Sequence, residues 1–142
     1  MKTSESKYKQ CIYFASNALA RVVEKLSIEE WKKVDLSPSH AYLLMLVLEE
    51  PGMQPGTIAG QLRLTPSTIT RLIEKLESKK LVVRTVEGKL TNVYPTPKAK
   101  ELQPRLIACA ESFTKMYYNI LGKEESDRLT RTMAKVADQL DQ

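Results

Sequence analysis

The stretch LTPSTITRLIEKLESKKLVVRTVEGKLTNVYPTPKAKEL, from Leu64 to Leu102, decides the fold. It begins with Thr65-Pro66, where a threonine hydroxyl can cap the first amides of a helix and proline fits the first turn. Apolar residues then recur at the spacing of one buried helix face: Ile69, Leu72, Ile73 and Leu76. The pattern predicts an amphipathic helix whose polar side faces outward.

The period then changes from that of a helix to that of a strand. Residues 81–86 are rich in β-branched side chains, residues 87–89 form a tight turn, and residues 90–94 return as a second strand. A two-stranded hairpin is not stable alone, so it must pack on the preceding helices. Thr96-Pro97 repeats the capping signal and starts a further long helix.

Two more helices are predicted upstream of this stretch. Ser37-Pro38 starts an apolar helix that ends before Pro51-Gly52, and a short helix follows from about 55 to 62. The order helix, brief turn, helix, hairpin is that of a winged helix-turn-helix. The predicted fold class is therefore mainly α with a small β-hairpin wing.

Long helices flank this unit on both sides. Apolar residues from Tyr8 to Leu26, Cys11 among them, recur at helical spacing, as do those of residues 102–120 and 129–140, with Gly122 as the stop between the last two. A helix of roughly 25 residues spans about 37 Å, more than a small winged core can cover. The exposed apolar stripes predict a two-fold homodimer, in which residues 1–36 and 97–142 are dimerisation helices and residues 37–96 the DNA-binding region of one structural unit.

The positive charge of the chain is concentrated in one segment. The net formal charge is +5, yet residues 61–105 carry 10 Lys and Arg against 4 Asp and Glu, whereas the rest of the chain is close to neutral. Such a segment suits a polyanionic partner. A lysine-rich solvated face is an equally good interpretation of the charge taken alone.

The candidate recognition helix presents small hydroxyls and basic side chains that can contact phosphates or base edges in a major groove. Lys89 marks the tip of the wing, and Arg84 either contacts phosphate or forms a structural ion pair. An ordinary amphipathic helix would also have a polar face, so the prediction rests on the order of the elements. The candidate DNA-binding residues are Thr65, Ser67, Thr68, Thr70, Arg71, Lys75, Arg84 and Lys89.

The segments LTPSTITRLIEKLESKKLVVR, residues 64–84, and YPTPKAKEL, residues 94–102, resemble the MarR family of bacterial and archaeal regulators. The resemblance implies a winged-helix dimer, a palindromic operator in double-stranded DNA and a small effector bound between the dimerisation and DNA-binding regions. It also assigns the major-groove role to Ser67, Thr68, Thr70 and Arg71. The chain departs from the family at Lys80, where glycine is usual, and in its short wing, which lacks the usual aspartate-arginine tip.

Two further residues are candidates for an effector or redox response. Cys11 falls in a region where some members of that family sense peroxide, but on the predicted apolar stripe a cysteine also serves as a small core residue. His40, the only histidine, lies near the effector region that the resemblance implies, and a structural role is the alternative. One histidine and two scattered cysteines do not make a zinc site.

No phosphate loop, nucleophile elbow or paired acid and base is present, so the sequence predicts neither an enzyme nor a cofactor. The lack of a signal-like or membrane-spanning apolar run predicts a cytoplasmic protein without a membrane partner. The expected function is a dimeric repressor released from DNA by a small effector or oxidant. The alternatives are a winged-helix protein-interaction module and a non-specific architectural DNA binder.

Overall fold

The computed structural model describes residues 1–142 and contains six α-helices and one antiparallel hairpin. A short 3₁₀ turn, η1 (Thr3–Glu5), precedes the first helix, and another, η2 (Lys32–Val34), follows it. The helices are α1 (Ile12–Trp31), α2 (Pro38–Glu49), α3 (Pro55–Leu62), α4 (Pro66–Ser78), α5 (Pro97–Leu121) and α6 (Lys123–Leu140), and the strands are β1 (Val82–Glu87) and β2 (Leu90–Pro95). This mainly helical winged architecture confirms the predicted fold class. None of the helices combines the length and apolar character needed to cross a membrane.

Three helices start at the predicted caps. The side chains of Ser37, Thr65 and Thr96 each accept a hydrogen bond from the backbone N–H three residues further on, and each is followed by a proline at the first helical position. A cap of this kind contributes about 1 kcal/mol to the stability of its helix. The beginnings of α2, α4 and α5 are therefore determined locally.

The hydrophobic core lies between α2, α3, α4, the hairpin and the first half of α5. Helix α2 is its centre, because it contacts α1, α3, α4, α5 and β2. Fully buried side chains come from every layer of this unit: Leu43, Leu44, Ile58, Ile69, Ile73, Leu76, Val82, Val93 and Leu106. Each such side chain contributes about 1.5–3 kcal/mol through burial. The hairpin is held on the helices by Val82 and Val93, as a two-stranded element requires.

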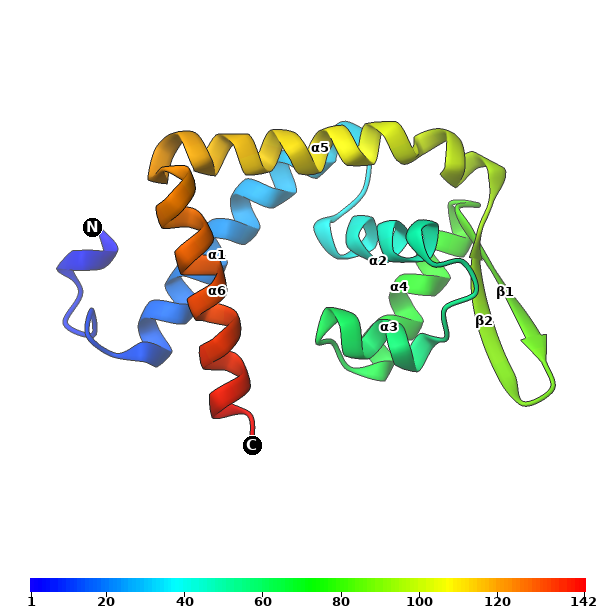
Figure 1. Ribbon diagram of the computed structural model, residues 1–142, viewed down its shortest axis with the longest axis horizontal. Coiled ribbons are helices and arrows are strands. Elements are labelled where there is room, and N and C mark those ends of the chain that lie inside the picture. Colours follow the sequence, from blue (N-terminus) through cyan, green and yellow to red (C-terminus); the bar gives the residue numbers. More distant parts are fainter.

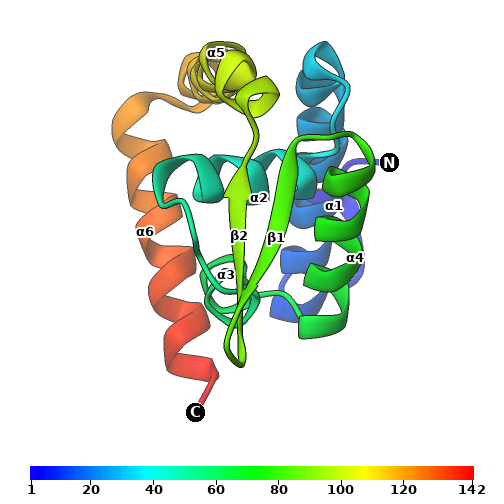
Figure 2. The same cartoon turned by 90° about the vertical axis from the view of Figure 1, so that its right-hand side faces the viewer.

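The long helices extend away from this core. In Figure 1, α5 runs along the top of the molecule, while α1 and α6 descend from it on the side opposite the wing. Gly122, with φ of +89°, separates α5 from α6, and the Tyr118 hydroxyl donates to the Asp127 carboxylate across this bend at 2.6 Å. The same view turned by 90° shows the hairpin in front, with α4 and α6 on opposite sides of it (Figure 2).

The side chains of α1, α5 and α6 leave an apolar groove uncovered. Its volume is about 380 Å³, and 11 of its 13 lining residues are hydrophobic. Leu19, Leu26, Ile120, Leu129 and Met133 are among them, and each is at least 39% exposed. This groove corresponds to the uncovered stripes predicted from the sequence.

The prediction for the start of the first helix was wrong. Tyr8 and Cys11 precede α1, because Cys11 has the extended backbone of an N-cap residue. Both side chains are exposed, so Cys11 is not part of an apolar helix face. Helical periodicity continued by chance into the turns that precede Ile12.

Candidate nucleic-acid interface

Helix α4 presents the polar face that the sequence predicted. Ser67, Arg71, Lys75 and Ser78 are exposed, and Ile69, Ile73 and Leu76 on the opposite side are buried. Neither Arg71 nor Lys75 forms a salt bridge within the chain. Two cationic side chains one turn apart are therefore free to bind anionic groups.

The hydroxyl groups at the start of α4 differ in how many hydrogen bonds they already make within the chain. Thr65 accepts from the Thr68 amide and lies 2.9 Å from the Thr68 hydroxyl, so these two side chains cap the helix. The Thr70 hydroxyl donates to the Pro66 carbonyl at 3.0 Å, which leaves its oxygen lone pairs available. Thr68 was expected on the open face but is partly buried. The Ser67 hydroxyl is exposed and lies 3.3 Å from that of Thr65.

The end of α4 is fixed by contacts that the sequence did not reveal. The Lys79 ammonium binds the carbonyl and the carboxylate of Asp35, at 2.8 and 3.1 Å. The Lys98 ammonium donates to the Lys79 carbonyl, and the Thr96 hydroxyl to the Lys80 carbonyl. Lys80 has the left-handed φ of 62°, a conformation that glycine adopts without the steric cost of a side chain. Helix α4 is thereby held by the connection before α2 and by the start of α5.

The wing is a regular hairpin with a two-residue turn. Glu87 pairs with Leu90, and Gly88 has φ of +65° at the first turn position, as a type II′ turn requires. Lys89 is exposed at this tip, as predicted. Met53 forms an additional bridge to Val93, which ties the base of the wing to the segment between α2 and α3.

Arg84 forms an ion pair within the chain. Its guanidinium lies 2.7 Å from the Glu77 carboxylate of α4, and both side chains are about one-third exposed, at 35% and 30%. Of the two roles considered for Arg84, the structural ion pair is the one observed. The pair joins the wing to the helix that carries Arg71.

The two candidate sensor residues lie in different parts of the fold, and His40 is near Lys75 and Lys79 at the end of α4. Cys11 is at the start of α1, whereas His40 is in the first turn of α2, partly buried, with its Nδ1 at the Ser37 hydroxyl. Burial, and then the nearby Lys79 and Lys75, lower the pKa of His40, so the ring is neutral at pH 7. The second cysteine, Cys109, is buried, and its burial raises the pKa of its thiol.

A buried donor lacks a partner close to the joint between the two regions. Trp31, at the end of α1, is completely buried and contacts Tyr42 edge-to-face with ring centroids 5.7 Å apart. Its Nε1–H has no hydrogen-bond acceptor. A buried N–H without an acceptor is unfavourable by about 1–3 kcal/mol.

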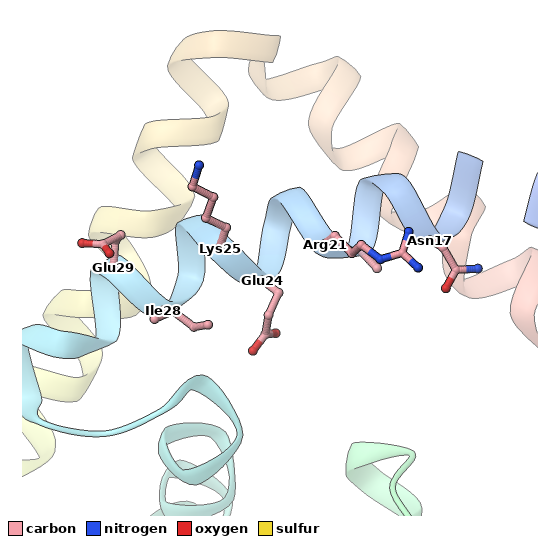
Figure 3. Close-up of a pocket in the computed structure, with 7 residues that line it drawn as sticks. Asn17, Arg21, Glu24, Lys25, Ile28 and Glu29 are labelled. Atoms are coloured by element: carbon pink, nitrogen blue, oxygen red, sulfur yellow. The ribbon is translucent and has the colours of Figure 1, made fainter. Parts of the chain in front are cut away.

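A further shallow hollow lies along the surface of α1. All of its lining residues belong to α1, among them Arg21, Glu24, Lys25, Ile28 and Glu29. Figure 3 shows that Lys25 and Glu24 point away from each other rather than toward a shared point. We therefore regard it as the outer surface of one helix and not as a ligand site.

Comparison with known proteins gives a consistent result. Residues 34–89 match the model of the MarR family. The chain is 25% identical over 121 residues to YybA of Bacillus subtilis (strain 168), an uncharacterised HTH-type transcriptional regulator, which covers 83% of this chain and 81% of the relative. It is 22% identical to MdtR of the same organism, an HTH-type transcriptional repressor, over 89% of this chain and 83% of the relative.

Solved structures with the same fold include proteins bound to DNA and a protein bound to a small molecule. The CouR repressor bound to a 23-mer DNA duplex aligns with a TM-score of 0.84 and 20% identity, over 96% of this chain and 98% of that one. CouR of Rhodococcus jostii RHA1 has also been solved with p-coumaroyl-CoA, and that structure aligns with a TM-score of 0.78 and 20% identity, over 96% and 95% of the two chains. MepR of S. aureus, solved with DNA, aligns with a TM-score of 0.80 and 18% identity, over 92% and 98%.

Proposed function

We propose that the chain, whose residues 34–89 match the MarR family model, is a winged helix-turn-helix transcriptional regulator that reads a palindromic operator in double-stranded DNA with α4. The observation that carries the proposal is the exposed face of α4, on which Arg71 and Lys75 have no partner within the chain. Arg71 is placed to bind a guanine edge or a phosphate, and Ser67 allows close approach. Lys89 at the wing tip supplies a flanking backbone contact. As a DNA-bound regulator the protein is not an enzyme, and it acts in the cytoplasm.

The functional unit that we propose is a homodimer. The apolar groove of α1, α5 and α6 is too exposed for an isolated chain, and a second copy with the same surface would cover it. A two-fold axis would also present two copies of α4 to two half-sites about one helical turn apart. A palindromic operator follows from this symmetry.

The test is selection of bound duplexes from a random pool, with the wild-type protein and with Arg71→Ala. Enrichment of a palindrome that the variant loses or relaxes would support a dimeric sequence reader. Enrichment of no sequence, despite binding, would indicate an architectural binder. Binding to no duplex would favour a protein-interaction module.

We further propose that a small effector releases the protein from DNA, as a repressor requires. The fold that the chain shares with CouR, a repressor solved with p-coumaroyl-CoA, supports an effector of this general kind. An effector acts only if it binds the DNA-free geometry more tightly than the DNA-bound one. Titration of candidate carboxylates and thioesters into the DNA complex tests this, and no release by any of them would leave a constitutive regulator.

An oxidant is the second candidate signal, and Cys11 is the residue that would sense it. Its thiol is exposed and free, which oxidation requires. The test compares the release from DNA of wild-type protein and Cys11→Ser at equal peroxide concentrations. Equal responses would remove Cys11 from the mechanism.

A further inference from the structure

A hollow whose charged lining residues are mainly cationic adjoins the recognition face. It lies between the end of α1 with η2, the start of α2 and the second half of α4, and its volume is about 360 Å³. The polar residues that line it are Lys32, Asp35, Ser37, His40, Lys75 and Lys79. We call it the His40 hollow.

Cations outnumber anions in the His40 hollow. Asp35 contributes the only carboxylate of the lining and is already bound to Lys79. Lys32 pairs with Glu29 on the exposed surface of the same helical segment, a contact of little strength in water. Lys75 has no anionic partner. The hollow is therefore able to accept an anion without displacing an internal contact of Lys75.

The histidine ring has one nitrogen available. Its Nδ1 is occupied by the Ser37 hydroxyl, while Nε2 has no hydrogen-bond partner. The charged groups that face it are Lys75 and Lys79 from α4, Asp35 from the preceding connection and Lys32 from η2. In the absence of a ligand the ring is surrounded mainly by cations, which disfavour its protonation.

The His40 hollow lies where α4 would cross the sugar-phosphate backbone of bound DNA. Helix α4 has 13 residues and is about 20 Å long, whereas the major groove is about 12 Å wide. Lys75 lies about 6 Å along the axis from Arg71, on the same face. When the N-terminal half of α4 occupies the groove, its C-terminal half must lie over the sugar-phosphate backbone that borders the groove.

We propose that the His40 hollow is a phosphate-binding site that takes a backbone phosphate of the operator, held by Lys75, Lys32 and the His40 Nε2–H. This inference rests on the proposed function and adds an anchor outside the recognition helix. A phosphate at this point favours the protonated ring, so the pKa of His40 rises on binding. Affinity for DNA then increases as the pH falls through the range between the bound and the free pKa, and becomes constant below the free value.

Because His40 is the only histidine, its ring proton resonance reports on the hollow without assignment. The experiment follows this resonance against pH in the free protein, with a bound duplex, and with inorganic phosphate at constant ionic strength. In parallel, DNA affinity is measured against salt for wild type, Lys32→Gln and the control Lys135→Gln, which removes an exposed lysine of α6 that has no ion pair. His40→Gln serves as the second variant.

The proposal predicts three results. The duplex raises the pKa of His40. Lys32→Gln lowers the slope of log K against log salt by about 1 per subunit, and Lys135→Gln leaves it unchanged. His40→Gln abolishes the increase of affinity as the pH falls through the titration of the ring, while retaining the selected sequence.

Other results would overturn it. If inorganic phosphate shifts the resonance with saturation and the duplex does not, the hollow is a site for a free anion. If neither shifts it and the salt slope of Lys32→Gln equals that of wild type, the hollow binds no phosphate, although the protein still reads DNA. If the wild-type protein binds no duplex, the proposed function fails together with this site.

Discussion

The Arg84 guanidinium of the wing lies 2.7 Å from the Glu77 carboxylate of the recognition helix, with Glu77 on the last turn of α4 and Arg84 three residues after Leu81. A cation that was a candidate phosphate ligand thus serves as a link between the two DNA-facing elements. Because both side chains are about one-third exposed, the pair contributes less than about 1 kcal/mol to folding. The pair mainly fixes the position of the wing relative to α4.

We expect Arg84→Gln to loosen the wing without removing a phosphate contact. The amides of β1 and β2 should exchange faster with solvent, since the wing would lose its link to α4 and keep only the buried valines Val82 and Val93 and the Met53 bridge at its base. The salt slope of DNA binding should equal that of wild type. Hydrogen exchange and affinity measured against salt check the two statements. A slope lowered by about 1 per subunit would mean that Arg84 leaves Glu77 and binds phosphate.

Arg71→Lys should separate charge from geometry. Lysine keeps the positive charge but lacks the planar fork that binds a guanine edge with two hydrogen bonds. Affinity for unrelated DNA should be nearly unchanged, while discrimination at one base pair of each half-site should fall by about 1–3 kcal/mol. Lys75→Ala is the comparison, because it should weaken all sequences evenly. Equal losses on all sequences for Arg71→Lys would place Arg71 on the backbone.

Thr65→Ala should destabilise the protein by about 1 kcal/mol, because the Thr68 amide loses its capping oxygen. Ser67→Ala is the matched control: it removes an exposed hydroxyl from the same turn but no bond to the backbone. Urea unfolding of the two variants gives the comparison. Thr65→Ser should restore most of the stability, and a loss as large for Ser67→Ala would argue against capping.

Met133→Glu should separate the subunits of the proposed dimer. The side chain lies in the apolar groove, where a carboxylate could be buried only at a large cost. Lys135→Glu introduces the same group on α6 outside the residues that line the groove. Sedimentation should show a smaller particle and weaker operator binding for Met133→Glu alone. An unchanged mass for both variants would show that another surface joins the subunits.

The two thiols should differ sharply in reactivity. Cys11 is exposed, whereas Cys109 is buried, and its pKa is raised by that burial. A thiol-specific reagent at pH 7.5 should therefore label one cysteine in the native protein and two after unfolding. Cys11→Ser should eliminate the fast reaction. Rapid labelling of Cys109 in the native state would contradict the packing of α5 on α1.

The features that the sequence predicted correctly are those encoded by neighbouring residues. The caps at Ser37, Thr65 and Thr96, a tight turn around Gly88 and the buried face of α4 all depend on contacts within a few positions, although Glu87, placed in the turn by the sequence, belongs to β1. Periodicity alone failed at Cys11, because an apolar pattern carries no information on where a helix begins when no capping side chain marks the place. Periodicity also predicted which side chains of α4 are exposed, except that Thr68 is partly buried.

The contacts that orient the site join distant parts of the chain. Lys79 and Asp35 are 44 positions apart, and Lys98 reaches the carbonyl of Lys79 from the next helix. No local pattern distinguishes such a lysine from one that faces solvent. For the same reason, an ion pair was only one of two open alternatives for Arg84 and its partner Glu77 was not identified. The His40 hollow, built from three separate segments, was not predicted either.

Three residues that are not glycine, Asp35, Arg63 and Lys80, end helical segments in the left-handed conformation. For an L-residue this conformation is unfavourable by about 1–2 kcal/mol. Asp35 and Arg63 use their side chains in ion pairs, with Lys79 and with Asp141 at the end of the chain, so glycine there would remove a contact. Lys80 contributes only backbone groups, its N–H to the Glu77 carbonyl and its carbonyl to the Thr96 hydroxyl, and glycine would retain both. Anyone engineering a more heat-resistant version of this protein would therefore begin with Lys80→Gly, a change that leaves Arg71, Lys75 and the wing tip untouched.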